Sequence, residues 1–222
     1  MKKCKIIAIA NQKGGAGKTT IATNVATALT THQKGVLFVD ADPQGSATDW
    51  ASMNEEYLFP TVAINSGNIG KQISMMLEKG NYDLVIIDCA PRMESEMASI
   101  ISIADLVVIP CMPSPLDLWA AESLVEMITT RQHLTGKPKA QFLLNGTHPL
   151  SKIQADVLES MADYGLECFD QSIAARTSYR RIMNEGKSVI FSEDIKASAE
   201  IHNLTNEILE VIHGIKQETE TA

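Results

Sequence analysis

The chain has 222 residues, of which 45% are apolar and only 5% aromatic, and its formal net charge at pH 7 is −8. This length and composition exclude a disordered chain and favour a single domain over residues 1–222 with a mostly aliphatic core and a frayed tail at 216–222. The negative charge argues against a protein that coats nucleic acid, although it leaves room for a local basic patch.

In chain order, short apolar runs alternate with longer helical patterns. We predict strands at 5–10, 36–42, 61–65, 82–91, 106–110 and 140–145, with a short one at 189–191. Between and after them we predict helices at 18–33, from 66 to about 79, and at 94–103, 114–134, 151–163, 175–185 and 196–215. Continuous apolar strands that alternate with helices are typical of a mostly parallel sheet with helices on both faces, so the predicted fold class is α/β.

The carboxyl ends of the predicted strands carry polar segments. In an open parallel sheet, ligands bind beyond these strand ends. The segments are Asn11–Thr20, Asp40 with Asp42, Asp88, Pro110–Ser114 and Asn145. The sequence therefore predicts one site along this edge of the sheet.

The first of these segments, "NQKGGAGKTT" at 11–20, follows a predicted strand and opens a predicted helix. Gly14, Gly15 and Gly17 allow the backbone to wrap around phosphates with its N–H groups pointing inward, and the helix start adds a positive end. The Lys18 ammonium would contact β- and γ-phosphate oxygens, and the Thr19 hydroxyl would bind Mg²⁺.

The spacing of this loop differs from the usual phosphate-loop pattern G-x-x-x-x-G-K-[ST]. Gln12 stands where that pattern has its first glycine, and a second lysine, Lys13, lies five residues before Lys18. Further along the chain, the apolar strand "LVIID" ends in Asp88, which would deliver a carboxylate to the Mg²⁺ shell. Together, the loop and this carboxylate predict a Mg²⁺–nucleotide site.

Three segments in this order, "KGGAGKTT", "VDADPQGSATDW" and "VIIDCAP", resemble those of the deviant Walker A P-loop ATPases of the ParA/MinD class. The segments "PCMPSPLDLWA" and "RTSYRRIMNEGKSV" are also similar to that group, and the resemblance covers the whole chain. It is closest to small ParA-type partition ATPases. It implies slow, Mg²⁺-dependent ATP hydrolysis to ADP and phosphate, an ATP-bound homodimer, nonspecific DNA binding and stimulation by a ParB-like partner.

The resemblance also implies roles for single residues. Lys13 would reach across the dimer to the partner's phosphates, and Asp42 would position or activate the attacking water. Asp40 would support Mg²⁺, and the Asn145 amide would read adenine. Turn-forming roles for Asp40, Asp42 and Asn145 remain as alternatives. The expected catalytic residues are Lys13, Lys18 and Asp42, and the expected metal-binding residues are Thr19, Asp40 and Asp88. The expected nucleotide contacts are Lys13, Gly14, Gly15, Ala16, Gly17, Lys18, Thr19, Thr20 and Asn145.

Basic residues concentrate in one part of the chain. Residues 131–187 contain eight basic and six acidic residues, whereas the segments on either side are acidic. By the resemblance, a basic patch in this part would bind DNA phosphates without sequence preference once the dimer forms. The candidates are Arg176, Arg180, Arg181 and Lys187. Ordinary solvated arginines, or an arginine near the nucleotide, remain the alternative.

A MinD-like, membrane-linked role needs a cationic amphipathic C-terminal tail, whereas this chain ends in the acidic "ETETA", so we expect no membrane partner. The chain also lacks an apolar run long enough for a signal peptide or membrane span. The four cysteines (Cys4, Cys89, Cys111 and Cys168) show no metal or disulfide spacing, which favours reduced thiols in a cytoplasmic protein. By the resemblance, its ATP-bound form would associate with the nucleoid. An iron–sulfur carrier and a P-loop ligase or synthase are further alternatives, and neither has a motif here.

Overall fold

The computed structural model describes residues 4–53, 58–64, 68–91, 94–148 and 152–214. Its strands are β1 (Lys5–Ile9), β2 (Val36–Asp40), β3 (Thr61–Ala63), β4 (Leu84–Asp88), β5 (Leu106–Cys111), β6 (Lys139–Thr147), β7 (Glu167–Cys168) and β8 (Ile173–Ala174). Its helices are α1 (Lys18–Thr31), α2 (Ser46–Ser52), α3 (Ile69–Lys79), α4 (Glu94–Ile103), α5 (Pro115–Thr135), α6 (Lys152–Ala162), α7 (Thr177–Asn184) and α8 (Ile195–His213), with a short 3₁₀ turn η1 (Val189–Phe191).

The strands form one parallel sheet in the order β3-β2-β4-β1-β5-β6-β7, and β8 pairs with β6 beyond the end of this path. β1 lies between β4 and β5, so the connections diverge to either side of it. Ligands bind in open sheets at such a switch point. The strand ends are in register there, because Asp88 lies beside Ile9 on one side and beside Asp40 on the other.

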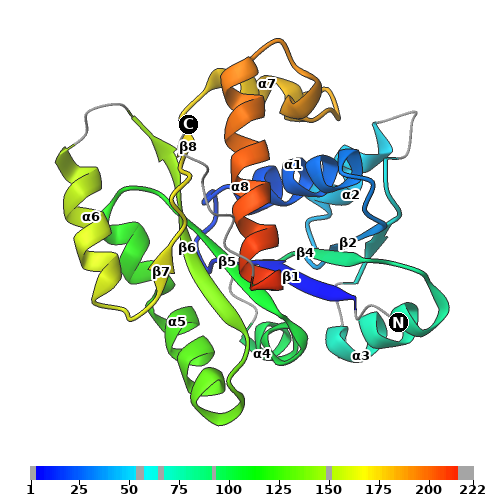
Figure 1. The fold of residues 1–222 in the computed structure, drawn as a ribbon, viewed down its shortest axis with the longest axis horizontal. Helices are drawn as coiled ribbons and strands as arrows, with labels where there is room; N and C mark the ends of the chain where they lie inside the picture. Colours follow the sequence, from blue (N-terminus) through cyan, green and yellow to red (C-terminus); the bar gives the residue numbers. More distant parts are fainter. Residues whose placement is uncertain (1–3, 54–57, 65–67, 92–93, 149–151, 215–222) are drawn as a thin grey trace.

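Helices cover both faces of the sheet, and Figure 1 shows the sheet running between the two groups. Alternate residues of each central strand belong to opposite faces: in β4, Val85 and Ile87 pack in the layer of α3 to α6, whereas Leu84 and Ile86 pack against α1 and α8. A strand buried on both faces must be apolar throughout, which explains the continuous apolar runs. The predicted α/β class with a parallel sheet is confirmed.

The sequence analysis missed three short elements, and one strand that it predicted was wrong. The strand expected at 189–191 is instead the 3₁₀ turn η1. Ser188 caps this turn, because its hydroxyl accepts a hydrogen bond from the Ile190 N–H. α2, β7 and β8 have too few residues to show a periodic pattern. The tail 216–222 lies outside the described residues. Within the described part of the chain, no helix combines the length and apolar character needed to cross a membrane.

Candidate nucleotide-binding site

The glycine-rich turn lies between β1 and α1, at the switch point of the sheet. Gly15 and Gly17 have φ angles of 78° and 91°, in the left-handed region that favours glycine. A Cβ atom at Gly17 would also overlap the side-chain amide of Asn145. No side chain caps the start of α1, and its first turn contains no acidic residue. The helix therefore directs its positive end, which no side chain of its own first turn neutralises, toward the turn.

Two asparagines hold this turn against neighbouring strand ends. The buried Asn11 amide donates a hydrogen bond to the Pro110 carbonyl at 2.7 Å, and its oxygen accepts one from the Lys13 N–H. The Asn145 amide donates to the Ala16 carbonyl at 2.8 Å. Asn145 therefore braces the loop from the end of β6. This contact leaves its side-chain oxygen as the group that could accept a hydrogen bond from a base.

Lys18 begins α1 and is only 7% exposed. Its ammonium donates a hydrogen bond to the Lys13 carbonyl oxygen at 3.0 Å. Burial lowers the pKa of Lys18, and the negative charge of Asp88 partly opposes this shift. A buried ammonium with one neutral acceptor has unused donors, so an anion bound in the turn would stabilise its charged form.

Asp88, at the end of β4, is 1% exposed, and neither carboxylate oxygen has a hydrogen-bond partner of good geometry among the described residues. Burial raises the pKa of Asp88 to about 7, and the nearby Thr19 hydroxyl partly opposes this rise. Because a carboxylate and a hydroxyl are hard oxygen donors, an unpaired buried carboxylate beside Thr19 fits Mg²⁺. The residues present therefore suit the metal expected from the sequence.

The raised pKa of Asp88 makes a prediction about stability. Between its ordinary pKa of 3.8 and about 7, the folded nucleotide-free protein keeps a proton that the unfolded chain releases, so stability falls as the pH rises. An Asp88→Asn variant lacks this loss. Its free energy of unfolding relative to the parent should increase by about 4 kcal/mol from pH 4 to pH 7 and then stay level. Urea unfolding across this range measures it, and a pH-independent difference would contradict the assignment.

Asp40 and Asp42 differ in how their carboxylates are used. Asp40 is fully buried, and its two oxygens accept hydrogen bonds from the Asp42 N–H and from the backbone and hydroxyl of Thr48. These contacts favour the turn-supporting alternative for Asp40. Asp42 is half-buried, and one oxygen accepts a hydrogen bond from the Gln44 N–H at 2.9 Å. Its other oxygen has no partner among the described residues, so it can act on a water molecule.

Lys13 forms an ion pair that was not predicted from the sequence. Its ammonium lies 2.6 Å from a carboxylate oxygen of Asp117, in the first turn of α5. The Asp117 side chain is 4% exposed, and its second oxygen has no partner among the described residues, whereas the Lys13 side chain is 39% exposed. The only sequence signal was an acidic residue near a helix start, which does not identify a distant partner.

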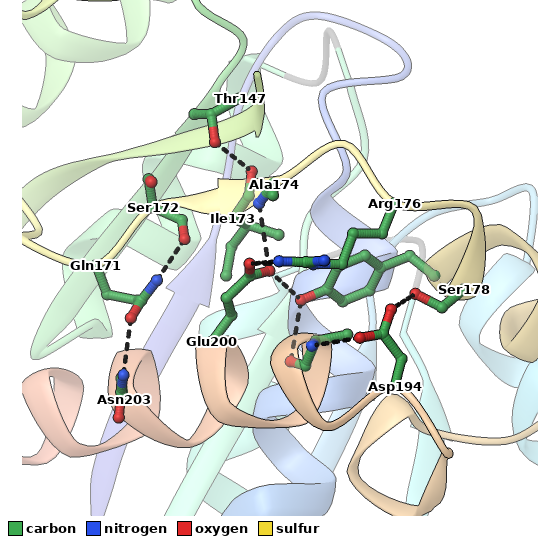
Figure 2. Close-up of polar contacts among 12 residues, drawn as sticks. Thr147, Gln171, Ser172, Ile173, Ala174, Arg176, Ser178, Asp194, Glu200 and Asn203 are labelled. Carbon is green, nitrogen blue, oxygen red and sulfur yellow. Dashed lines mark hydrogen bonds and ion pairs between the residues drawn. The ribbon is translucent and has the colours of Figure 1, made fainter. Parts of the chain in front are cut away.

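The four candidate DNA-binding residues have different surroundings. The Arg176 guanidinium donates two hydrogen bonds to one Glu200 oxygen, at 3.1 and 2.6 Å (Figure 2). Glu200 also accepts a hydrogen bond from the Tyr179 hydroxyl. Arg176 thus ties the start of α7 to α8. Lys187 lies 3.4 Å from a Glu185 oxygen in an exposed pair. Arg180 and Arg181 are exposed and have no ion-pair partner among the described residues, so they are the candidates best able to contact phosphate.

Comparisons with known proteins show the family of the chain. Residues 7–189 match the family model described as the CobQ/CobB/MinD/ParA nucleotide binding domain. The chain is 35% identical over 214 residues to the maintenance of carboxysome distribution protein A of Halothiobacillus neapolitanus, covering 93% of this chain and 97% of that protein. It is 26% identical over 243 residues to the sporulation initiation inhibitor protein Soj of Bacillus subtilis, covering 89% and 95% respectively. A solved McdA–ATP complex from Cyanothece has a TM-score of 0.73 at 20% identity, covering 99% of this chain and all of that one.

Proposed function

The chain belongs to the CobQ/CobB/MinD/ParA nucleotide-binding domain family, and from this premise we propose that it is an ATP-driven positioning ATPase. The observation that carries the proposal is the buried, unpaired carboxylate of Asp88 beside Thr19, below a glycine turn that also contains the buried Lys18. In this arrangement the positive charge of Lys18 attracts a triphosphate, and the negative charge of Asp88 attracts its metal ion. One P-loop ATPase domain spanning the chain would perform the whole cycle.

ATP and Mg²⁺ are the ligands of this site in the proposal. The backbone of Gly14–Thr20 and the Lys18 ammonium bind the phosphates, and Thr19 and Asp88 hold Mg²⁺. The metal supplies charge neutralisation at the phosphate oxygens. Asp40 keeps the loop that contains Asp42 in position, so that the free oxygen of Asp42 can orient a water molecule and accept its proton.

Dimerisation depends on Lys13 in this proposal. In the free chain its ammonium is held by Asp117, and the phosphates of a second ATP-loaded copy compete for it. A lysine supplied by the partner neutralises phosphate charge only in the dimer, so nucleotide binding and dimerisation become coupled. The 39% exposure of the Lys13 side chain supports this exchange, because the ammonium needs little desolvation to move.

The ATP-bound dimer then holds nonspecific DNA, which places it on the nucleoid in the cytoplasm, and a ParB-like adaptor bound to cargo stimulates hydrolysis and release. The exposed Arg180 and Arg181 support the DNA step, because dimerisation doubles any such patch. The similarity to a carboxysome distribution protein supports a large protein assembly as cargo. The second candidate, a MinD-like protein-positioning switch without DNA, is supported by the acidity of the chain as a whole.

DNA binding tests the proposal directly. Binding to a random-sequence duplex should require ATP and Mg²⁺, be absent with ADP or no nucleotide, and weaken steeply when salt is raised from about 50 to 200 mM. We expect Arg180→Ala with Arg181→Ala to lose at least tenfold in affinity while keeping the ATP-dependent dimer. The matched control replaces the exposed Lys71 and Lys79 of α3 by Ala and should bind normally.

Fluorescence anisotropy of a labelled duplex measures these affinities. Absence of binding in every nucleotide state would reject the DNA step and leave the protein-positioning switch. Equal losses in the two double variants would mean that total charge, and not the α7 arginines, determines binding.

A further inference from the structure

A groove of about 820 Å³ runs between α5 and α6, and the sequence analysis did not identify it. We refer to it as the α5–α6 groove. Its rim includes Trp119, Glu122, Glu126, Asp156, Asp163 and Tyr164. Trp119, Glu122 and Glu126 recur along α5 at three- and four-residue spacing and so form one stripe that faces α6, while Asp156 comes from α6 and Asp163 and Tyr164 follow the end of α6.

The groove exposes a large aromatic side chain above a buried apolar floor. Trp119 is 62% exposed and has no aromatic partner among the described residues, whereas the only other tryptophan, Trp50, is 4% exposed. The floor of the groove is formed by buried aliphatic side chains, including Leu118 and Val157. An exposed indole above an apolar floor is typical of the anchor position in a protein interface.

The groove is also strongly negative. Four of its twelve lining residues are carboxylates and none is basic. Within the described residues, none of the four forms an ion pair. Their field extends to the Tyr164 hydroxyl, whose pKa is raised by burial and then by the charges of Glu122 and Asp163. An occupant that brings positive charge would therefore be attracted to it.

We propose that the α5–α6 groove docks a basic segment of a partner protein, with an apolar side chain of that segment packed on Trp119. The carboxylates would repel DNA and anionic lipid, and the same groove of a second copy carries the same charge. The stripe from Pro115 to Thr129 is about 21 Å long, which accommodates about fourteen residues of helix.

The groove adjoins the nucleotide site through α5. Leu118, on its floor, directly follows Asp117, which holds the Lys13 ammonium. An occupant would thus contact the helical turn that carries this ion pair, where a small shift would change how firmly Lys13 is held. This consequence rests on the proposed function. Docking itself does not, and it can be measured without nucleotide.

The probe is a fluorescein-labelled peptide of about fourteen residues, built from lysine and leucine to form a basic amphipathic helix. A version with glutamate in place of lysine serves as its control. Titration of the nucleotide-free protein should shift the Trp119 emission to shorter wavelength, and Trp119→Phe should remove the shift because Trp50 is already buried. The glutamate peptide should not bind.

Specificity is tested by two sets of charge removals. The combined groove variant Glu122→Gln, Glu126→Gln and Asp163→Asn should weaken lysine-peptide binding roughly tenfold at low salt. The control variant replaces Glu78, Glu159 and Glu193, which are exposed outside the groove, by Gln, and should change affinity less than about twofold. Equal losses in both variants, or an unchanged Trp119 emission on binding, would overturn the proposal.

Discussion

Replacing Asp42 by Ala is expected to leave ATP binding intact and to slow hydrolysis by about 10²- to 10⁴-fold, the range of a lost general base. One carboxylate oxygen of Asp42 is used by the Gln44 N–H, and the other is free to contact the attacking water. The variant should consequently accumulate as the ATP-bound dimer. Single-turnover hydrolysis and light scattering on the same sample measure both effects.

Asp42→Asn is the matched control for the turn. The asparagine oxygen can still accept the Gln44 hydrogen bond, but the side chain cannot take a proton at neutral pH. We expect this variant to be as slow as the alanine variant. Parental turnover in Asp42→Asn, with slow turnover in Asp42→Ala, would show that Asp42 acts through the turn and not on the water.

Lys13→Ala is expected to abolish ATP-dependent dimerisation while the monomer still binds nucleotide. The physical reason is that the γ-phosphates of two loaded copies repel each other unless each copy supplies a cation to the other. Analytical sizing with a slowly hydrolysed ATP analogue, at saturating Mg²⁺, measures the dimer, and a labelled nucleotide measures binding. A dimer of parental affinity would reject the role of Lys13 and the switch that depends on it.

The Asp117 ion pair provides the control for folding. Removing Lys13 leaves a buried carboxylate uncompensated, which destabilises a protein by up to about 3–5 kcal/mol. The double variant Lys13→Ala with Asp117→Asn removes that charge and should recover most of the stability, yet still fail to dimerise. Asp117→Asn alone should dimerise at least as well as the parent, because Lys13 is then held less firmly.

The sequence predicted most of the fold because the relevant signals are local. Apart from Lys5 at the start of β1 and Asp88 at the end of β4, the runs of β1, β4 and β5 are continuously apolar, since both faces of each strand are covered, and this pattern is visible without knowing the neighbours. The two-residue strands β7 and β8 have no such signal, because pairing with β6 decides their conformation. The apolar run of η1 predicted a strand, but capping by Ser188 makes it a 3₁₀ turn.

The phosphate loop, Lys18, Thr19 and Asp88 could be predicted from the sequence as a candidate site, because a glycine turn between a strand and a helix and an acid ending an apolar strand are short-range patterns. For Asp40 the sequence predicted a position near Mg²⁺. In the structure its carboxylate instead accepts hydrogen bonds from the backbone N–H groups of Asp42 and Thr48, in the segment that follows it. A sequence does not show whether an acid at a strand end faces inward to a ligand or back to the following turn.

By itself, then, the sequence determined the parallel α/β architecture and the groups that can hold a Mg²⁺–nucleotide, because periodicity and spacing act within one strand–turn–helix unit. Only the tertiary structure decided that Asp117, 104 positions away, holds Lys13, and that Asn145, 129 positions away, braces Ala16. The α5–α6 groove, too, is visible only in the tertiary structure. Such pairings depend on the order of strands in the sheet, and strand order brings together side chains whose separation along the chain carries no signal of contact.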